Sequence, residues 1–137
     1  MREIKGIEKA ELVIGRWNPS DLAIIEALEW KGDQDTGASI LVIQTLFQQR
    51  AAHWPDLDKE MFRVVLVFEG VGGLRLKDFG GGAVQIMGFD IHFVGDRGLE
   101  GVNYEISDYE DDRIRFSCGS VSVQSVGPVG PGAVLEN

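Results

Sequence analysis

The stretch Met61–Phe79, MFRVVLVFEGVGGLRLKDF, decides the fold. Its first half places alternate apolar side chains on one face: Phe62, Val64, Leu66 and Phe68. Val65 and Val67 make the opposite face apolar as well, so we expect a strand in the middle of a sheet, covered on both faces. Glycines interrupt the run between residues 70 and 73, and the alternation that follows predicts a second, half-exposed strand.

The segments before this strand predict one helix and one hairpin. Residues 6–15 carry apolar side chains separated by charged ones, which indicates a short amphipathic helix. Residues 22–30 fit either a capped helix or a strand. Because the turn-forming residues 31–37 and the β-rich run 40–47 follow, we favour an antiparallel hairpin.

The second half of the chain predicts several short strands. The apolar positions within residues 84–93 change parity at Gly88, which predicts a β-bulge there. Tight turns at 95–98 and 108–112 separate further strands, and the parity changes again at 119–120. We therefore expect a mainly β (α+β) protein, an antiparallel meander of about eight strands with one N-terminal helix. The strands would form a curved sheet or a two-layer sandwich.

The length and composition of the chain predict one soluble domain. A chain of 137 residues is long enough for a single core without metal or disulfide staples. Its 44% hydrophobic and 26% charged residues are typical of globular proteins, and 18 glycines suit a β protein with many turns. We expect residues 1–126 to form the domain and residues 127–137, GPVGPGAVLEN, to form a flexible Gly/Pro tail.

Charge and cysteine content restrict the partners and the compartment. The formal net charge of −9 disfavours binding to nucleic acid or anionic membrane and suits a basic protein partner. Cys118 is the single cysteine, so we expect a small buried hydrophobe in a reducing environment. No apolar stretch approaches the length of a membrane span. The prediction is a cytoplasmic bacterial protein.

The sequence contains no motif that predicts catalysis, a cofactor or a metal. The glycines before Arg75 match neither the dinucleotide fingerprint nor a P-loop, and the acidic run 108–112 lacks the spacing of a calcium loop. His53 and His92 are the two histidines and fit no zinc spacing. We expect a protein without a catalytic site. The enzyme alternative is a hydrolase that uses His92 with Asp90 or a distant acid.

Acidic and aromatic side chains are the candidates for contact with a protein partner. The acidic turn supplies four carboxylates: Asp108, Glu110, Asp111 and Asp112. Trp17, Trp30 and Trp54 each flank a loop, where a tryptophan either packs against the core edge or anchors an interface. Negative potential speeds the encounter with a basic protein, and exposed aromatic side chains supply anchors. We therefore predict partner contacts at the acidic turn and at Trp54.

Four segments of the chain carry a resemblance to a known group of proteins: IEKAELVIGRW (7–17), NPSDLAIIEALEW (18–30), VVLVFEGVGGLRLKDFGGG (64–82) and FSCGSVSV (116–123). Together they resemble small β-rich bacterial immunity proteins of polymorphic toxin systems and neighbouring uncharacterised families. Such families often have Pro-Ser-Phe-His-Asp before the first strand, where this chain has Pro19-Ser20-Asp21-Leu22 without the histidine. No functional residue is therefore carried over.

The functional hypothesis combines the residues with this resemblance. The residues predict a non-catalytic module that binds a protein through a complementary surface. The resemblance implies an immunity protein that neutralises a toxin. The alternative outside this class is a structural domain that associates with its own copy through a sheet edge or an apolar patch.

Overall fold

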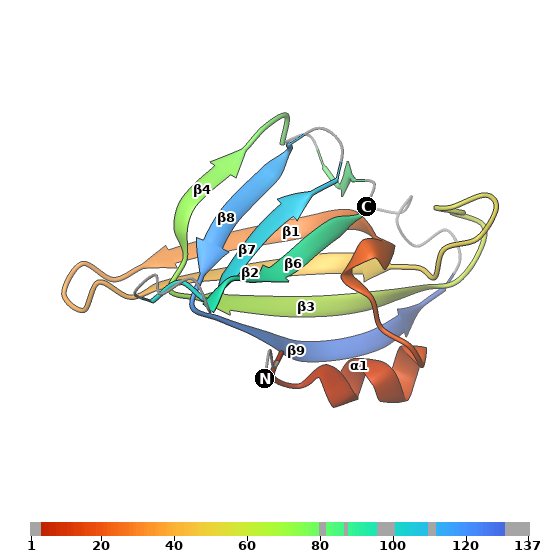
Figure 1. The fold of residues 1–137 in the computed structure, drawn as a ribbon. Coiled ribbons are helices and arrows are strands. Elements are labelled where there is room, and N and C mark those ends of the chain that lie inside the picture. Colours follow the sequence, from red (N-terminus) through yellow and green to blue (C-terminus); the bar gives the residue numbers. More distant parts are fainter. Residues whose placement is uncertain (1–3, 80–81, 87, 96–100, 110–111, 131–137) are drawn as a thin grey trace.

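The computed structural model describes residues 4–79, 82–86, 88–95, 101–109 and 112–130 (Figure 1). Within these residues the chain forms one α-helix, one short 3-10 helix and nine strands. In chain order the elements are α1 (Ile7–Ile14), η1 (Pro19–Asp21), β1 (Leu22–Gly32), β2 (Ser39–Phe47), β3 (Met61–Glu69), β4 (Gly72–Leu76), β5 (Val84–Gln85), β6 (Phe89–Phe93), β7 (Tyr104–Asp108), β8 (Ile114–Cys118) and β9 (Ser120–Val129). The prediction of a mainly β protein with one N-terminal helix is confirmed.

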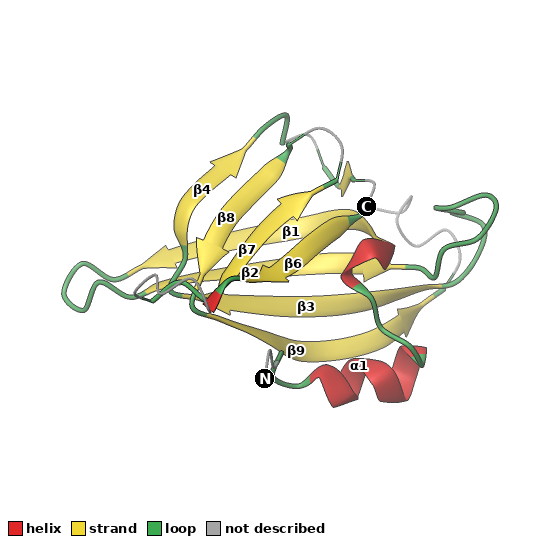
Figure 2. Cartoon of the chain, in the orientation of Figure 1, coloured by secondary structure: helices red, strands yellow, loops and turns green. Residues whose placement is uncertain are grey.

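The strands form two antiparallel sheets that pack face to face around a shared core (Figure 2). The larger sheet has the order β5-β1-β2-β3-β9, and the smaller has the order β4-β8-β7-β6. The rings of Phe68 in β3 and Phe116 in β8 meet edge to face across the layers, with centroids 4.9 Å apart. Of the two expected architectures the chain therefore adopts two layers, and its described part has nine strands where about eight were expected.

Strand β3 lies inside the larger sheet, between β2 and β9, as predicted. Val64, Leu66 and Phe68 are fully buried against the smaller sheet. Val65 and Val67 lie on the opposite face and are only half-buried. The prediction that both faces are covered is thus half correct, because the smaller sheet packs against one face of β3 alone.

The N-terminal segment covers the β9 side of the core. Val123 of β9 donates its backbone N–H to the Lys5 carbonyl (2.7 Å). The helix α1 follows and packs along β9, with Ala10 fully buried (Figure 1). Trp17 then places its ring 5.4 Å from that of Phe47 at the end of β2. The predicted helix is confirmed, and its apolar stripe closes one side of the sandwich.

The ambiguous segment 22–30 is a strand. It belongs to β1, which pairs with β2 from Leu22 opposite Phe47 to Gly32 opposite Ser39. The ladder extends over the whole length of β2. Of the buried residues at the start of β1, Leu22 and Ile25 pack in the main core, and Ala23 and Ile24 pack in a smaller apolar cluster. The hairpin prediction is therefore confirmed. The segment is a strand and not a helix because its pairing with β2 outweighs the local capping signal for a helix.

The two parity changes mark places where the chain crosses between sheets, so the predicted bulge at Gly88 is wrong. Strand β5 pairs in the larger sheet and β6 in the smaller one. The same crossing separates β8 from β9 at Gly119. When the chain crosses to the opposite sheet, the face of the strand that points to the core changes. The core-facing positions therefore switch between even and odd numbers without the extra residue that a β-bulge would insert. At Gly88 φ is +92°, and a Cβ would lie 2.5 Å from the Ser20 carbonyl oxygen, so glycine is required.

Strand β9 extends three residues into the predicted tail. Val129, 7% exposed, pairs with Met61 and packs against it in a small apolar cluster. Pro128 is tolerated because a proline can occupy an edge strand. The boundary predicted at residue 127 is therefore too early, and residues 131–137 lie outside the described residues, as do residues 96–98 of the predicted turn.

Two further expectations concern burial and hydropathy. Cys118 is fully buried, and this burial raises the pKa of its thiol to about 12, which confirms a small buried hydrophobe. Within the described part of the chain, no helix has the length and apolar character needed to cross a membrane.

Candidate partner-binding surface

The loop between β2 and β3 carries Trp54 and is held in place by Gln48. The Gln48 side chain donates from Nε2 to the Asp56 carbonyl (2.9 Å) and accepts at Oε1 from the Asp56 N–H (2.7 Å). The Trp54 indole N–H donates to the Gln48 carbonyl, and the Trp54-Pro55 peptide bond is cis. The position of Trp54 is therefore fixed by the hydrogen bonds of its own loop.

The Trp54 ring lies between an apolar cluster and a guanidinium group. On one side it packs against a buried cluster: Ala23, Ile24, Leu46, Met61 and Val129. Arg50 covers the ring, with Cζ 3.7 Å from the ring centroid, in a cation–π arrangement. Arg50 also donates from Nε (3.2 Å) and Nη2 (3.0 Å) to the Ser20 carbonyl. The guanidinium is thus held between Trp54 and η1.

Tyr109, just after β7, lies beside this arginine and is 53% exposed. Burial raises the pKa of the Tyr109 hydroxyl, and the negative charges of Asp90 and Asp21 act in the same direction. The charge of Arg50 and a hydrogen bond with the Ser20 side chain oppose the rise. We call the four residues Ser20, Arg50, Trp54 and Tyr109 the Trp54–Tyr109 surface.

The buried residue Asp21 connects η1 to the residues of this surface. Asp21 is 7% exposed, and burial raises the pKa of its carboxyl. A hydrogen bond from the Arg50 backbone and the charges of Arg50 and Arg16 counteract this rise. The Asp21 backbone carbonyl also accepts from the Gln48 N–H (3.1 Å). These contacts join η1 to the start of the Trp54 loop and fix Arg50 at both its backbone and its side chain.

The predicted acidic contact residues have different environments. Asp108 is half-buried, and its Oδ1 accepts from the first backbone N–H of β8 (3.0 Å), so it helps to close the β7–β8 turn. The Asp112 side chain is 60% exposed and free of such a backbone role among the described residues. Glu110 and Asp111 lie outside the described residues.

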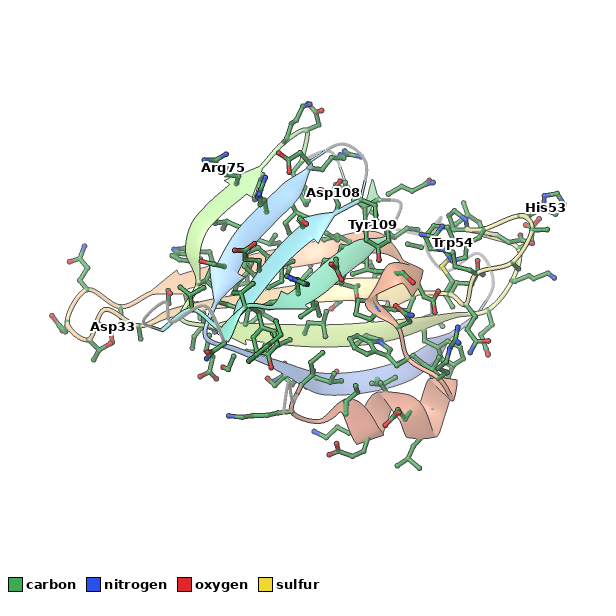
Figure 3. The ribbon with its side chains drawn as sticks, viewed as in Figure 1. Asp33, His53, Trp54, Arg75, Asp108 and Tyr109 are labelled. Carbon is green, nitrogen blue, oxygen red and sulfur yellow. The ribbon has the colours of Figure 1, made fainter. Side chains whose placement is uncertain are left out.

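The structure brings Trp54 and the acidic turn to the same end of the molecule. In Figure 3, Tyr109 lies between Asp108 and Trp54. Trp30, 47% exposed, lies near the β1–β2 turn at the opposite end, where Asp33 is labelled. The sequence interpretation missed Tyr109 and Arg50. A lone aromatic residue inside a charged turn was a usable signal for Tyr109, whereas nothing in the sequence marks Arg50.

A hollow of about 320 Å³ adjoins the Trp54 loop. Part of the loop lines it together with Phe62 of β3, including Gln49, Ala51, Ala52 and His53. His53 itself is exposed on the outer part of the loop (Figure 3). The loop therefore offers both a concave apolar surface and an aromatic–arginine pair.

The enzyme alternative depends on His92, which lies on the edge strand β6. His92 is exposed, and its Cα is paired with that of Glu105 in β7, while Asp90 lies two residues away on the same outer face. In the described part of the chain, no three His, Cys, Asp or Glu side chains gather where they could hold a metal ion.

These contacts make the Trp54–Tyr109 surface the candidate for partner binding. The resemblance to immunity proteins and a catalytic role for His92 both stay predictions. No protein-family model, curated protein or solved structure matches the chain.

Proposed function

We propose that the protein is a non-catalytic module that binds a protein partner through the Trp54–Tyr109 surface. The proposal is carried by the arrangement of Arg50 between Trp54 and Ser20, beside the half-exposed Tyr109. Tryptophan, tyrosine and arginine dominate the energetic centres of protein interfaces. Because Arg50 is already ordered by these contacts, less side-chain freedom is lost when a partner covers it.

The charge of the protein defines the class of partner. A net charge of −9 attracts a basic protein over a distance of about one Debye length, roughly 8 Å at physiological salt. Asp112, exposed in the turn next to Tyr109, is positioned for such an encounter. An immunity protein that neutralises a basic toxin is the specific form of this proposal.

The test is affinity capture from the native host, followed by titration of the captured basic protein. We expect Tyr109→Ala to weaken the complex about thirtyfold, the loss typical of an interface hot spot. Trp30→Ala removes an aromatic side chain of similar exposure at the other end of the molecule and serves as the matched control. Equal losses for Tyr109→Ala and Trp30→Ala would argue against this surface.

The two alternatives give different results in simple measurements. A molar mass of a homodimer in light scattering that falls to that of a monomer on dilution would favour the self-associating domain. A hydrolase would lose its activity in a broad substrate screen on His92→Ala, with its fold intact. Partner binding that is unchanged in His92→Ala and a monomer in solution would favour the module.

A further inference from the structure

Two arginines lie directly opposite each other on the outer face of the smaller sheet. Arg75 of the edge strand β4 is paired with Arg115 of β8. Like charges in this position destabilise an antiparallel pair. Within the described residues, the one acid within ion-pair distance of either guanidinium is Asp112, with Oδ1 3.9 Å from Arg115 Nη1. Both of these side chains are more than half exposed, so this contact offsets little of the repulsion.

The remaining arginines with described contacts are used differently. Arg50, Arg63 and Arg113 donate short hydrogen bonds to protein oxygens: the Ser20 carbonyl, the Glu26 carboxylate, and the Gln85 and Asp78 carbonyls. No comparable hydrogen bond holds Arg75 or Arg115 among the described residues. Their donors are therefore directed at solvent or at something that the protein binds.

The paired arginines line a cavity of about 430 Å³. Arg115 and Ser117 alternate with buried residues along β8, so they face away from the core and into this cavity. The β4–β8 register shifts between Gly72 and Arg75, and Gly73 has φ +64°, as expected for a bulge. Gly72, which pairs with Ser117, and Gly73 add no side chains to the wall of the cavity, and this leaves it open. Figure 3 labels Arg75 on β4.

We infer that this cavity binds a small molecule through a carboxylate or phosphate oxyanion held between Arg75 and Arg115. Guanidinium groups bind both oxyanions through paired, charge-assisted hydrogen bonds. The Ser107 hydroxyl lines the same cavity and supplies a further donor, whereas the Ser117 hydroxyl donates to the Gly72 carbonyl (3.4 Å). A bound oxyanion also removes the repulsion between the two cations. The inference stands apart from the Trp54–Tyr109 surface, because none of the four residues of that surface lines the cavity.

Glu105 also lines the cavity and limits the charge of the ligand. Its carboxylate is half-buried on β7, so it repels a second negative charge. We therefore expect the cavity to prefer a singly charged oxyanion to a doubly charged one. Replacement of Glu105 by Gln removes that repulsion and strengthens the binding of phosphate.

The test is an NMR titration of the isotope-labelled protein with inorganic phosphate and, separately, with acetate at constant ionic strength. We expect saturable shifts confined to residues 72–75, 105–107 and 115–117. The tighter of the two probes identifies the oxyanion class. Arg75→Gln and Arg115→Gln should each weaken binding about tenfold, the loss expected for a charge-assisted pair of hydrogen bonds.

The matched control is Lys31→Gln, which removes one positive charge from the exposed β1–β2 turn region. Its affinity for either probe should equal that of the wild type. The amide spectrum of each free variant reports whether it is folded. If a variant is unfolded, Arg75→Lys is used in its place, because lysine keeps the positive charge and lacks the paired donors of the guanidinium group. Absent saturation, shifts outside the cavity, or the same weakening in Lys31→Gln would overturn the inference.

Discussion

Removal of the Arg63 side chain is expected to lower the free energy of unfolding, because it leaves the nearly buried Glu26 carboxylate on the larger sheet without its cationic partner. Glu26 of β1 has a side chain only 8% exposed, and it accepts from Arg63 Nε (2.8 Å) and Nη2 (3.0 Å) in a two-point contact. Gln44 donates a third hydrogen bond to the same carboxylate (3.1 Å). Arg63→Met keeps the aliphatic stem of the side chain and leaves the Glu26 charge with Gln44 alone.

The magnitude follows from the exposure of the two partners. Breaking a fully buried pair costs about 3 to 5 kcal/mol, because one charge stays in a poor solvent. Arg63 is 38% exposed, so water replaces part of its contact, and we expect Arg63→Met to cost about 2 to 3 kcal/mol. Glu26→Gln leaves no buried charge and should cost about 1 kcal/mol. The double variant should therefore cost less than the two single variants together.

The pH dependence gives an independent measurement of the same pair. Burial by itself raises the pKa of Glu26, but the hydrogen bonds of Arg63 and Gln44 outweigh it and lower the pKa overall. A lowered pKa means that the pair stabilises the protein above the unfolded pKa, about 4.3, and that this contribution is lost as the pH falls through the folded value. The penalty of Arg63→Met should thus be largest at pH 7 and shrink in acid.

Urea unfolding followed by tryptophan fluorescence measures these free energies. The matched control is Lys31→Met, which breaks an exposed pair with Glu29 (3.5 Å, both side chains more than 60% exposed) and should cost less than about 1 kcal/mol. The reasoning is refuted if Arg63→Met costs no more than Lys31→Met, or if its penalty is the same at pH 4 and pH 7.

The remaining predictions concern the core. Leu66→Ala should lower the free energy of unfolding by about 2 to 5 kcal/mol in urea, because Leu66 is fully buried and a cavity would remain. Val65→Ala, on the half-buried face of the same strand, should cost clearly less, and equal costs would show that the two faces of β3 are equally covered. Cys118 should resist thiol reagents at pH 8 until the protein unfolds. Its raised pKa, about 12, also predicts that stability falls as the pH rises above about 9, and Cys118→Ala should reduce this fall.

The local features of the fold were predictable because they depend on neighbouring residues. The two-residue alternation of β3 and the apolar stripe of α1 follow directly from the sequence. The crossings at Gly88 and Gly119 were not distinguishable from bulges, since both reverse the inward parity. The assignment of β4 and β8 to a second layer depends on long-range pairing, and alternation along one strand carries no information on its partner.

The candidate surface was predictable only in part, for a related reason. Trp54 and the acidic turn stand out in the sequence by residue type. Their meeting depends on η1, which receives the Arg50 side chain and contacts β6 at the edge of the smaller sheet. Segments that are distant in the sequence supply Ser20, Arg50 and Tyr109, so no local pattern could indicate their contact.

The β7–β8 turn lies between the proposed partner surface and the proposed oxyanion cavity. Tyr109 begins this turn, and Asp112 at its end lies 3.9 Å from Arg115. An oxyanion bound to Arg115 would compete with Asp112, but an ion pair with both side chains more than half exposed is worth at most about 1 kcal/mol. Such a coupling changes partner affinity about fivefold at most. The two sites are therefore nearly independent, and a negative result at one surface leaves the argument for the other intact.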